Sequence, residues 1–438
     1  MVTLRIVVPV LQEGDGLARR LSALTPLRAR GAELVVVDGG SSDATWAVAC
    51  AHADRVVLAR RGRAAQMNAG TEGGPCRTLL FLHADTQLPE GADALIEEAL
   101  AGGALWGRFD VRIDSAHPLL RLVETMMNLR SRLTGIATGD QAIFVRRDVF
   151  VALGGFADLP LMEDIELSRR LKERGAPACL RERVLSSGRR WEKHGVARTV
   201  ALMWRLRAAW FFGADPAALA LRYGYAPAPP PPPPAVIAVL AKAPQPGQAK
   251  TRLMPALGAA GAARAQRRFT LNTLRSAQAA SLGPVRLWCA PDAQHRFFRA
   301  LARRRGVDGF AQPGGDLGAR MQHAFARHFE MQPRLPMLLV GTDCPLLAPA
   351  HLQRAARALQ DHDAVLIPAE DGGYVLIGLR SPLPALFEGV DWSTPRVLAQ
   401  TRERLRAVAA AWCELDPLWD VDEPADWQRL QQLENPDA

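Results

Sequence analysis

The stretches LRIVVPVLQE (residues 4–13) and ELVVVDGGSSDAT (residues 33–45) decide the fold. Each opens with a short aliphatic run, the pattern of a strand buried on both faces of a parallel sheet. Each run then ends in acidic and small residues. Because open α/β sheets place their binding groups at the carboxyl ends of strands, we expect Pro9, Glu13 and Asp38 to face a ligand.

Similar apolar runs continue through the chain, separated by amphipathic stretches long enough for helices. They cover residues 55–59, 78–85 and 141–145 in the first half, and residues 235–242, 285–290, 337–343, 363–369 and 373–379 in the second. The alternation predicts an α/β fold in each half, with a mostly parallel, Rossmann-like sheet covered by helices.

A proline-rich stretch separates the two halves. Residues 226–235, APAPPPPPPA, have proline at seven of ten positions, which excludes a helix interior or a central strand. We expect a semi-rigid polyproline II linker between a domain over 1–225 and a domain over 236–438.

The composition is that of a globular protein of 438 residues, with 48% hydrophobic and 23% charged residues. No apolar run approaches the roughly 18 residues of a membrane span, and the start has no signal-peptide pattern, so we expect a cytoplasmic protein. The net charge of +9 is spread over both halves, which argues against a nucleic-acid partner. Six cysteines without a CxxC pair indicate reduced thiols. The composition leaves the oligomeric state open.

Polar residues at the strand ends of the first half form the candidate site. A carboxylate followed by small residues can accept hydrogen bonds from a flat base while the backbone comes close. Arginines beside a glycine at the start of a helix are suited to binding a phosphate. The residues concerned are Pro9, Glu13, Asp38, Gly39, Ser41, Asp43, Arg61, Arg63, Asn68, His83 and Asp85.

The first half resembles the family 2 glycosyltransferases, and most closely a radical-SAM and selenodomain-associated subgroup. The motifs that carry the resemblance are PVLQE (9–13), VVDGGSSDAT (36–45), GRAAQMNAG (62–70), HADT (83–86), GDQAIF (139–144) and MEDIELSRRL (162–171). The resemblance implies a nucleotide-diphospho-sugar-transferase fold and a nucleotide-sugar donor. It also implies that Asp38 binds the base, that Asp85 holds Mg²⁺ or Mn²⁺ on the diphosphate, and that Arg61 and Arg63 lie near the diphosphate.

The same resemblance implies that Asp164, beside Glu163, is the general base of an inverting transfer. The alternative is a helix cap with favourable charge, since acidic residues are common at helix N-termini. Asp140 and Gln141 are candidates to face the acceptor or to form a turn. Arg190 and Trp191 are further acceptor candidates, in a segment without the glutamine of processive synthases, which favours a single transfer.

Two features of the first half leave alternatives open. The family's usual aspartate-x-aspartate is His83-Ala84-Asp85 here, so His83 is either a metal ligand or a core residue. Residues 196–213, VARTVALMWRLRAAWFFG, either lie on a membrane surface near a lipid-linked acceptor or pack on their own domain.

The second half opens with AKAPQPGQAKTRL (241–253), which contains two of the four lysines among 54 basic residues. Its prolines and glycine predict a loop. The loop either binds a triphosphate or is a solvated basic turn. Its candidate residues are Lys242, Gly247, Lys250, Thr251 and Arg252.

The second half resembles the DUF2064 proteins, relatives of nucleotidyltransferases, through this loop and five further motifs. They are GGDLGARM (314–321), GTDCP (341–345), EDGGYVLIGL (370–379), VDWSTP (390–395) and WDVDEPADW (419–427). The resemblance implies that Asp343 holds a metal with Asp420 or Asp422, that Lys250 and Arg252 bind the triphosphate, and that Gly372 and Gly373 approach a nucleotide. Asp371 and Asp391 are weaker candidates.

These observations predict a fused enzyme. In it, a metal-dependent glycosyltransferase moves a sugar to a small or lipid-linked acceptor, and a second domain forms or binds the nucleotide-activated donor from a nucleoside triphosphate. The first alternative is a glycosyltransferase with an inactive nucleotide-binding or regulatory second domain. The second alternative is a non-enzymatic scaffold, which the acidic strand ends disfavour.

Overall fold

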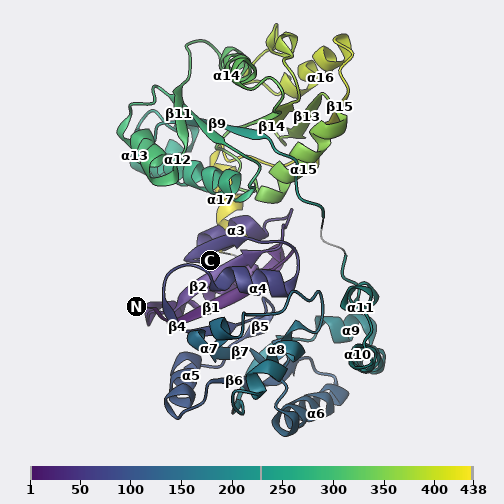
Figure 1. Ribbon diagram of the computed structural model, residues 1–438. Coiled ribbons are helices and arrows are strands. Elements are labelled where there is room, and N and C mark those ends of the chain that lie inside the picture. The colour runs from purple at the N-terminus through teal and green to yellow at the C-terminus, as the bar shows by residue number, and fades with distance from the viewer. Residues whose placement is uncertain (1, 227–228, 436–438) are drawn as a thin grey trace. The chain divides into compact units, whose positions relative to one another are not determined.

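The computed structural model describes residues 2–226 and 229–435, without the side chains of Asp15 and Arg190. The chain forms two compact units, residues 1–229 and 230–438, so the division falls inside the proline-rich stretch. Each unit is an α/β fold with one largely parallel sheet (Figure 1). The predicted fold class is therefore confirmed.

The sheet of the first unit has the order β3-β2-β1-β4-β7-β6-β8-β5 among the described residues. The four strands from β3 to β4 are parallel. β7 runs antiparallel to β4 and β6, whereas β6 and β8 are parallel to each other. The strands are β1 (Val2–Val10), β2 (Glu33–Asp38), β3 (Arg55–Leu58), β4 (Cys76–Phe81), β5 (Thr86–Gln87), β6 (Trp106–Asp114), β7 (Ile143–Arg146) and β8 (Ala178–Ser187).

Helices cover this sheet, and the core lies between them and the aliphatic strand residues. Ile6, Val7, Leu34 and Val35 are fully buried, as the continuous apolar runs predict for strands covered on both faces. The helices are α1 (Gly14–Ser22), α2 (Thr25–Ala29), α3 (Thr45–His52), α4 (Arg63–Thr71), α5 (Ala92–Ala101), α6 (Pro118–Thr134), η1 (Gly139–Gln141, a 3-10 turn), α7 (Arg147–Ala152), α8 (Glu163–Lys172), α9 (Arg189–His194), α10 (Val196–Phe211) and α11 (Pro216–Tyr223).

The second unit repeats the topology of the first. Its order β11-β10-β9-β12-β14-β13-β15 has β14 antiparallel to β12 and β13, in the place that β7 takes in the first unit. The strands are β9 (Val236–Lys242), β10 (Val285–Ala290), β11 (Asp308–Ala311), β12 (Met337–Val340), β13 (Ala364–Pro368), β14 (Tyr374–Leu379) and β15 (Trp412–Glu414). The helices are η2 (Thr251–Leu253), α12 (Met254–Ala279), α13 (Arg296–Arg305), α14 (Leu317–Met331), α15 (Pro349–Asp361), η3 (Pro384–Phe387), α16 (Val397–Ala407) and α17 (Pro424–Glu434).

The sequence patterns did not reveal strands β5, β6, β8, β11 and β15. In β6, the charged residues Arg108 and Asp110 are buried and form an ion pair, so the strand lacks a continuous apolar run. The run over 78–85 also ends as a strand at Phe81, and Asp85 lies in the following turn.

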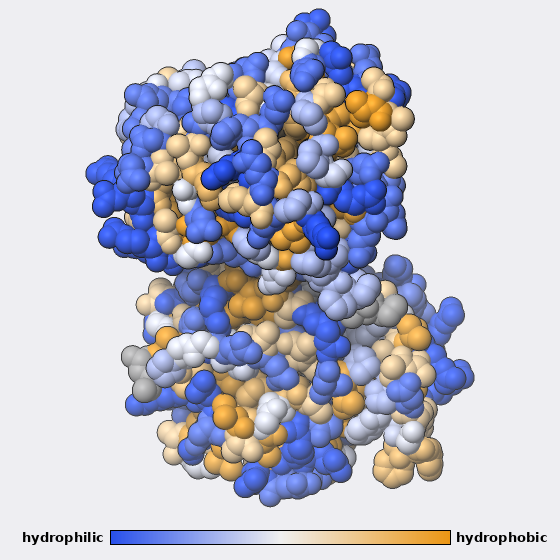
Figure 2. Space-filling model, turned by 45° about the horizontal axis from the view of Figure 1, so that its top comes forward, coloured by the Kyte–Doolittle hydropathy of each residue, from blue (hydrophilic) through white to orange (hydrophobic). Residues whose placement is uncertain are grey.

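Hydrophilic and hydrophobic residues are interspersed over the face of each unit that Figure 2 shows. Within the described residues, no helix is long and apolar enough to cross a membrane.

Helix α4 is held against the sheet by one polar and one small residue. The Gln66 Nε2 donates to the carbonyls of Val10 and Val37, at 2.8 Å each, and so joins the ends of β1 and β2. One turn later, a Cβ on Gly70 would lie 2.3 Å from Cγ1 of Val7. A glycine is needed there because the helix backbone touches the strand.

Gly70→Ala should destabilise the first unit by about 1–3 kcal/mol, since the added methyl group overpacks the contact with Val7. The measurement is the free energy of unfolding in urea. Gly74→Ala is the matched control, because a Cβ there meets nothing within 4 Å. Equal stability of the two variants would contradict this account of the α4 packing.

Candidate active site

The loops that follow β1 and β2 are hydrogen-bonded to each other. Gln12, in the left-handed region with φ 54°, donates through its backbone N–H to the Ser41 hydroxyl at 2.9 Å. Its side-chain carbonyl accepts from the Ser42 N–H at 2.9 Å. The Asp43 carboxylate accepts from the Gly14 N–H at 3.0 Å. The two motifs PVLQE and DGGSSD therefore form one rigid surface.

Asp38 lies buried at the base of this surface. Its Oδ1 accepts from the N–H groups of Gly40 and Ser41 and from the Ser41 hydroxyl, at 3.1, 2.9 and 2.6 Å. Its Oδ2 is buried without a hydrogen-bond partner. Burial raises the pKa of Asp38 to about 6, although the Ser41 hydrogen bonds oppose it. One carboxylate oxygen is thus left to accept a hydrogen bond from a ligand.

Glu13 is tied to the same surface. Its N–H donates to the Thr45 hydroxyl at 2.8 Å, and its Oε2 pairs with Arg20 at 2.9 Å and with Arg189 at 3.3 Å. Pro9 is the penultimate residue of β1. Glu13 therefore links the β1 loop to α9 and is not free to bind a ligand alone.

Arg63 is the first residue of α4, and its guanidinium lies 5.8 Å from the centre of the Tyr225 ring. Burial opposes its charge, but Tyr225 and Glu163 outweigh this effect and raise the pKa of Arg63. The Nε of Arg61 is buried without a partner. Both arginines keep donors for an anion.

Asn68 has a structural role in this arrangement. Its amide donates to the Phe156 carbonyl at 2.8 Å and accepts from the Phe156 N–H at 2.9 Å. This pairing uses both the nitrogen and the oxygen of the amide. Asn68 was expected to bind the donor, but in the structure its amide fixes the loop before α8.

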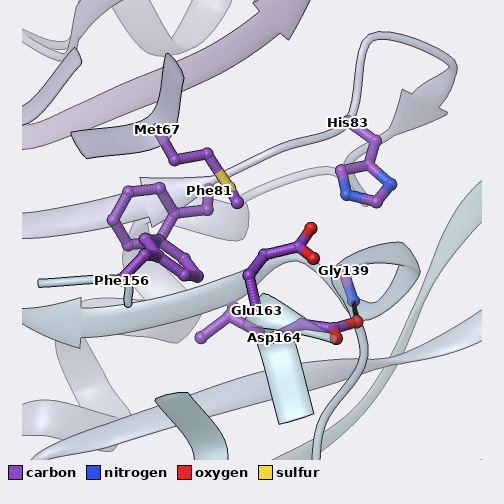
Figure 3. A pocket seen from close by; sticks show the side chains of 8 residues that line it. Met67, Phe81, His83, Gly139, Phe156, Glu163 and Asp164 are labelled. Atoms are coloured by element: carbon purple, nitrogen blue, oxygen red, sulfur yellow. Dashed lines mark hydrogen bonds between the residues drawn. The ribbon is translucent and has the colours of Figure 1, made fainter. Parts of the chain in front are cut away.

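A small pocket opens where α8 begins, and Figure 3 shows carboxylates from α8 close to the η1 turn. Gly139 closes one side of it, because a Cβ there would lie 2.3 Å from Nε2 of His83. Only glycine allows this approach. The lining residues are Met67, Phe81, His83, Gly139, Ile143, Phe156, Glu163 and Asp164.

Glu163 and Asp164 occupy the first turn of α8, as the motif predicted. Asp164 accepts from the N–H groups of Gly139 and Ile165, at 2.8 Å each, so its carboxylate has a fixed orientation. Burial and the neighbouring Asp164 charge raise the pKa of Glu163 to about 7. A buried carboxyl group with a raised pKa, beside a second carboxylate, is typical of acid–base sites.

His83, which lines this pocket, contacts Asp140 of the η1 turn, with Nδ1 3.2 Å from Oδ1. Burial opposes ionisation of Asp140, but the hydrogen bond from His83 and the charges of Arg63 and Arg207 outweigh it and lower the pKa of Asp140. His83 is itself buried. In this geometry His83 acts as the partner of Asp140.

Asp85 lies just beyond β4 and is half-buried. Within the described parts of the chain, its carboxylate has no hydrogen-bond or ion-pair partner, and no three His, Cys, Asp or Glu side chains gather as a metal-binding group. A cation bound by Asp85 would take most of its ligands from elsewhere.

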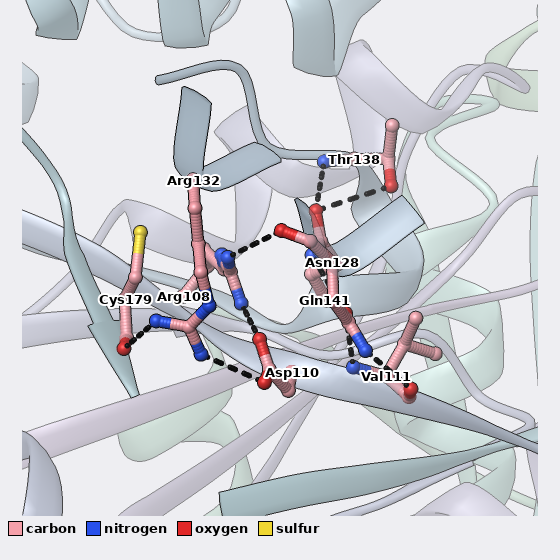
Figure 4. A network of polar contacts seen from close by, with 8 residues as sticks. All are labelled: Arg108, Asp110, Val111, Asn128, Arg132, Thr138, Gln141 and Cys179. Carbon is pink, nitrogen blue, oxygen red and sulfur yellow. Dashed lines mark hydrogen bonds and ion pairs between the residues drawn. The ribbon is translucent and has the colours of Figure 1, made fainter. Parts of the chain in front are cut away.

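Gln141 does not face the pocket, which corrects the expectation that it contacts an acceptor. Its side chain is fully buried, and its Oε1 accepts from the Thr138 N–H at 3.1 Å. It belongs to the polar network in Figure 4, in which Asn128 bonds both backbone groups of Val111. This network holds β6, α6 and the η1 turn together.

Trp191 is also buried, among Ile113 and Leu120, so it stabilises the packing of α9 and cannot stack on an acceptor. The side chain of Arg190 lies outside the described part of the structure. Asp140 is therefore the acceptor candidate whose side chain contacts a residue of the pocket, His83.

In the second unit, Lys250 bridges two aspartates. Its Nζ lies 2.8 Å from Asp343, 2.6 Å from Asp422 and 2.8 Å from the Val421 carbonyl. Burial opposes its charge, but the two carboxylates outweigh this effect and raise the pKa of Lys250. All three ammonium donors are used. The expected triphosphate contact of Lys250 is therefore absent from this arrangement, in which the lysine neutralises the predicted metal ligands.

The other loop residues remain accessible. Arg252 is exposed and lies 3.7 Å from Asp422, and Lys242 is exposed at the end of β9. Gly247 has φ 79°, which favours glycine in the turn, and Thr251 begins η2. Burial and the charges of Asp371 and Asp422 raise the pKa of Asp420 to about 6.

Gly372 is required for packing. Its φ is 91°, and a Cβ there would lie 2.3 Å from the Pro395 carbonyl oxygen. Gly373 donates its N–H to Asp371 at 2.9 Å. Close approach to the 390–395 loop therefore explains Gly372 without a nucleotide.

Sequence reasoning missed two charged residues of the site, Arg130 on α6 and Arg207 on α10. The charge of Asp164 acts on both. Neither belongs to a recognisable motif, and only the packing of α6 and α10 brings them to α8.

Comparison with family models places the first unit among the glycosyltransferases. Residues 5–150 match the family described as glycosyl transferase family 2, and residues 273–394 match DUF2064, described as an uncharacterized protein conserved in bacteria. No curated protein matches the chain.

Three solved structures illustrate the similarity. A "putative nucleotide-diphospho-sugar transferase" from Desulfovibrio desulfuricans G20 is 31% identical, over 47% of this chain and 88% of that one, with a TM-score of 0.43. TarS 1-349 from S. aureus is 15% identical, over 42% and 60%, with a TM-score of 0.35. The mannosyltransferase PcManGT from Pyrobaculum calidifontis, solved with GDP-Man and Mn²⁺, is 22% identical, over 51% and 65%, with a TM-score of 0.36.

The family match over residues 5–150 defines the class of the first unit, which is a family 2 glycosyltransferase domain. The chain is a fusion of this domain with a DUF2064 domain.

Glu163→Gln should raise the melting temperature of the first unit at pH 8 by several degrees and change it little at pH 5. The raised pKa of about 7 means that folding favours the protonated Glu163, so its contribution to stability is lost as pH rises through 7. Calorimetry at both pH values measures the effect. Glu173→Gln, at the exposed other end of α8, is the control. A pH-independent shift would contradict the raised pKa.

Proposed function

We propose that the first unit transfers a sugar, with inversion, from a nucleotide-sugar donor to a small or lipid-linked acceptor. The observation that carries this proposal is the carboxylate pair at the start of α8, with Asp164 oriented by the Gly139 N–H beside a pocket. A positioned carboxylate can remove the acceptor's proton while the sugar is attacked from the opposite face.

The donor half of the reaction rests on the loops after β1 and β2. The free Oδ2 of Asp38 can accept a hydrogen bond from the base, and Gly39 and Ser41 lie beside it in the rigid loop. Arg61 and Arg63 keep N–H donors for the diphosphate. The leaving diphosphate carries several negative charges, so nearby guanidinium groups would stabilise its departure.

A divalent cation, Mg²⁺ or Mn²⁺, fits this site through Asp85. The carboxylate is half-buried and unpaired within the described chain, and carboxylate oxygen is the donor that such cations prefer. Because Asp85 offers a single carboxylate, diphosphate oxygens would supply further ligands. When bound, the cation would neutralise charge on the leaving diphosphate.

The lipid-linked form of the acceptor is supported by the outer surfaces of α6 and α10. Large hydrophobic side chains are exposed there, and they are Leu119, Leu122, Met126, Leu129 and Leu133 on α6 and Trp204 and Phe211 on α10. We infer peripheral contact with a membrane over residues 196–213. All six cysteines are free, which supports a reducing, cytoplasmic location.

For the second unit we propose binding of a nucleoside triphosphate or of the donor formed from it. Fusion would then raise the local concentration of a shared intermediate. Asp343 and Asp422 do not fit a divalent cation as they stand, because the Lys250 ammonium fills the position between them. This arrangement favours a nucleotide-binding module without turnover over a nucleotidyltransferase.

Asp85→Asn and Asp164→Asn should separate binding from chemistry. With Mn²⁺ and a panel of UDP-, GDP- and dTDP-sugars, Asp85→Asn should lose metal-dependent donor binding in calorimetry. Asp164→Asn should bind donor within twofold of the parent but transfer or hydrolyse it about 10²–10⁴-fold more slowly. Asp148→Asn, an exposed carboxylate of α7, is the control. Unchanged turnover in Asp164→Asn would exclude it as the base.

Lys250→Met should create Mn²⁺ binding in the second unit without nucleotide, because it removes the ammonium between two carboxylates. In an Asp85→Asn background, the Mn²⁺ affinity measured by electron paramagnetic resonance should rise at least tenfold. Lys242→Met, an exposed lysine of the same loop, should leave it unchanged. Equal Mn²⁺ binding in all three chains, each folded by circular dichroism, would show that Lys250 does not occupy a cation position.

A further inference from the structure

Helices α6 and α10 share an apolar seam that ends in two arginines. Leu120 and Val123 of α6 pack in one cluster with Val200 and Met203 of α10. Arg130 follows Val123 by seven residues, and Arg207 follows Val200 by seven, which returns each to the same face of its helix. The seam thus brings two guanidinium groups together.

Among the residues that the structure describes, these two guanidinium groups lack partners. The Nε and one terminal nitrogen of Arg130 are buried without a hydrogen bond. Neither Arg130 nor Arg207 forms a side-chain hydrogen bond or ion pair within the described part of the chain. Burial and the charge of Arg207 lower the pKa of Arg130 to about 10, with Asp164 opposing. Both side chains are half-buried, and burying guanidinium nitrogens without partners is costly, so the pair is typical of a binding site for an anion.

The balance of charge around Asp164 also favours the binding of an anion. Asp164 acts on Arg130 and Arg207, while Asp140 acts on Arg207. Glu163, with a pKa of about 7, is protonated in a large share of molecules near neutral pH. Together with Arg63, the cations of this cluster therefore outnumber the ionised carboxylates.

The position of the arginines separates them from the donor. Arg130 lies on the helix after β6, and Arg207 lies on the second helix after β8, in the β7-β6-β8 half of the sheet. The residues proposed to bind the donor follow β1, β2 and β4, in the other half. An anion held by Arg130 and Arg207 next to Asp164 is therefore on the acceptor side.

We propose that Arg130 and Arg207 bind a phosphate group of the acceptor. This contact would orient the acceptor so that its nucleophilic hydroxyl oxygen faces Asp164. The planar guanidinium fork matches phosphate oxygens, and two such groups neutralise a phosphate dianion. This inference rests on the proposed sugar transfer. It narrows the acceptor to a phosphorylated molecule, whether the phosphate belongs to a soluble compound or to a lipid headgroup.

The test is a titration of the full chain with inorganic phosphate. Binding is measured by isothermal calorimetry and by the melting temperature of the first unit. The parent should bind phosphate and melt higher in its presence. The double variant Arg130→Gln/Arg207→Gln should bind one phosphate fewer per chain, or bind it at least tenfold more weakly, and its melting temperature should no longer respond. Arg198→Gln/Arg205→Gln, two exposed arginines of α10, should behave as the parent.

Stability distinguishes a ligand site from a structural role. Without phosphate, the double variant should melt at the same temperature as the parent or higher, because it loses two unpaired cations. Phosphate binding by the double variant equal to that of the parent would overturn the proposal, and so would a lower melting temperature without phosphate. The titration needs no donor, so it can succeed even if the proposed sugar transfer fails.

Sedimentation with lipid vesicles distinguishes a lipid-borne phosphate from a soluble one. Phosphatidylcholine vesicles with one-fifth phosphatidic acid should sediment the parent, and not the double variant, if the phosphate is lipid-borne. Parent that binds inorganic phosphate but stays in the supernatant has a soluble phosphorylated acceptor. Sedimentation of parent and double variant to the same extent would exclude the two arginines as the lipid phosphate site.

Discussion

The site of the first unit depends on the close approach of Gly139 to two other segments. Its N–H donates to the Asp164 carboxylate at 2.8 Å, and its Cα faces the His83 ring so closely that no Cβ fits. The η1 turn, the loop after β4 and the start of α8 therefore have one common arrangement. The buried network of Gln141 and Asn128 fixes that turn from behind. Any side chain at position 139 would separate the proposed base from the rest of the site.

Around this point the protein keeps charge that burial makes unfavourable. Asp38 has one carboxylate oxygen without a partner, Glu163 has a raised pKa, and Arg130 has buried nitrogens without hydrogen bonds. A fold selected for stability alone would pair or remove such groups. Their presence at the end of β2, in the first turn of α8 and on α6 is the physical reason to regard these positions as the place of chemistry.

The second unit has the corresponding strand order, but the carboxylates at the ends of its strands are paired differently. Asp85 follows β4 in the first unit, and Asp343 follows β12, the strand in the equivalent position. Asp85 has no side-chain partner among the described residues, whereas Asp343 and Asp422 share the Lys250 ammonium. One topology therefore carries an open carboxylate in one copy and an internally neutralised pair in the other, which is consistent with division of labour between the two units.

The sequence by itself determined both α/β folds and most central strands, because continuous apolar runs are a local signal. It also indicated Asp38, Asp85 and Asp164 through ordered motifs. It missed β6, in which the charged residues Arg108 and Asp110 are buried as an ion pair and Asp110 also pairs with Arg132 of α6. It also missed β8, in which the exposed Arg181, Glu182 and Arg183 interrupt the apolar pattern. Only the tertiary structure decided that Gln141 and Trp191 are buried, that Lys250 is held by two aspartates, and that the charge of Asp164 acts on Arg130 and Arg207. The reason is physical. The sequence specifies the chemical type of each side chain, but the partner of that side chain depends on packing between distant segments, which no local sequence pattern specifies.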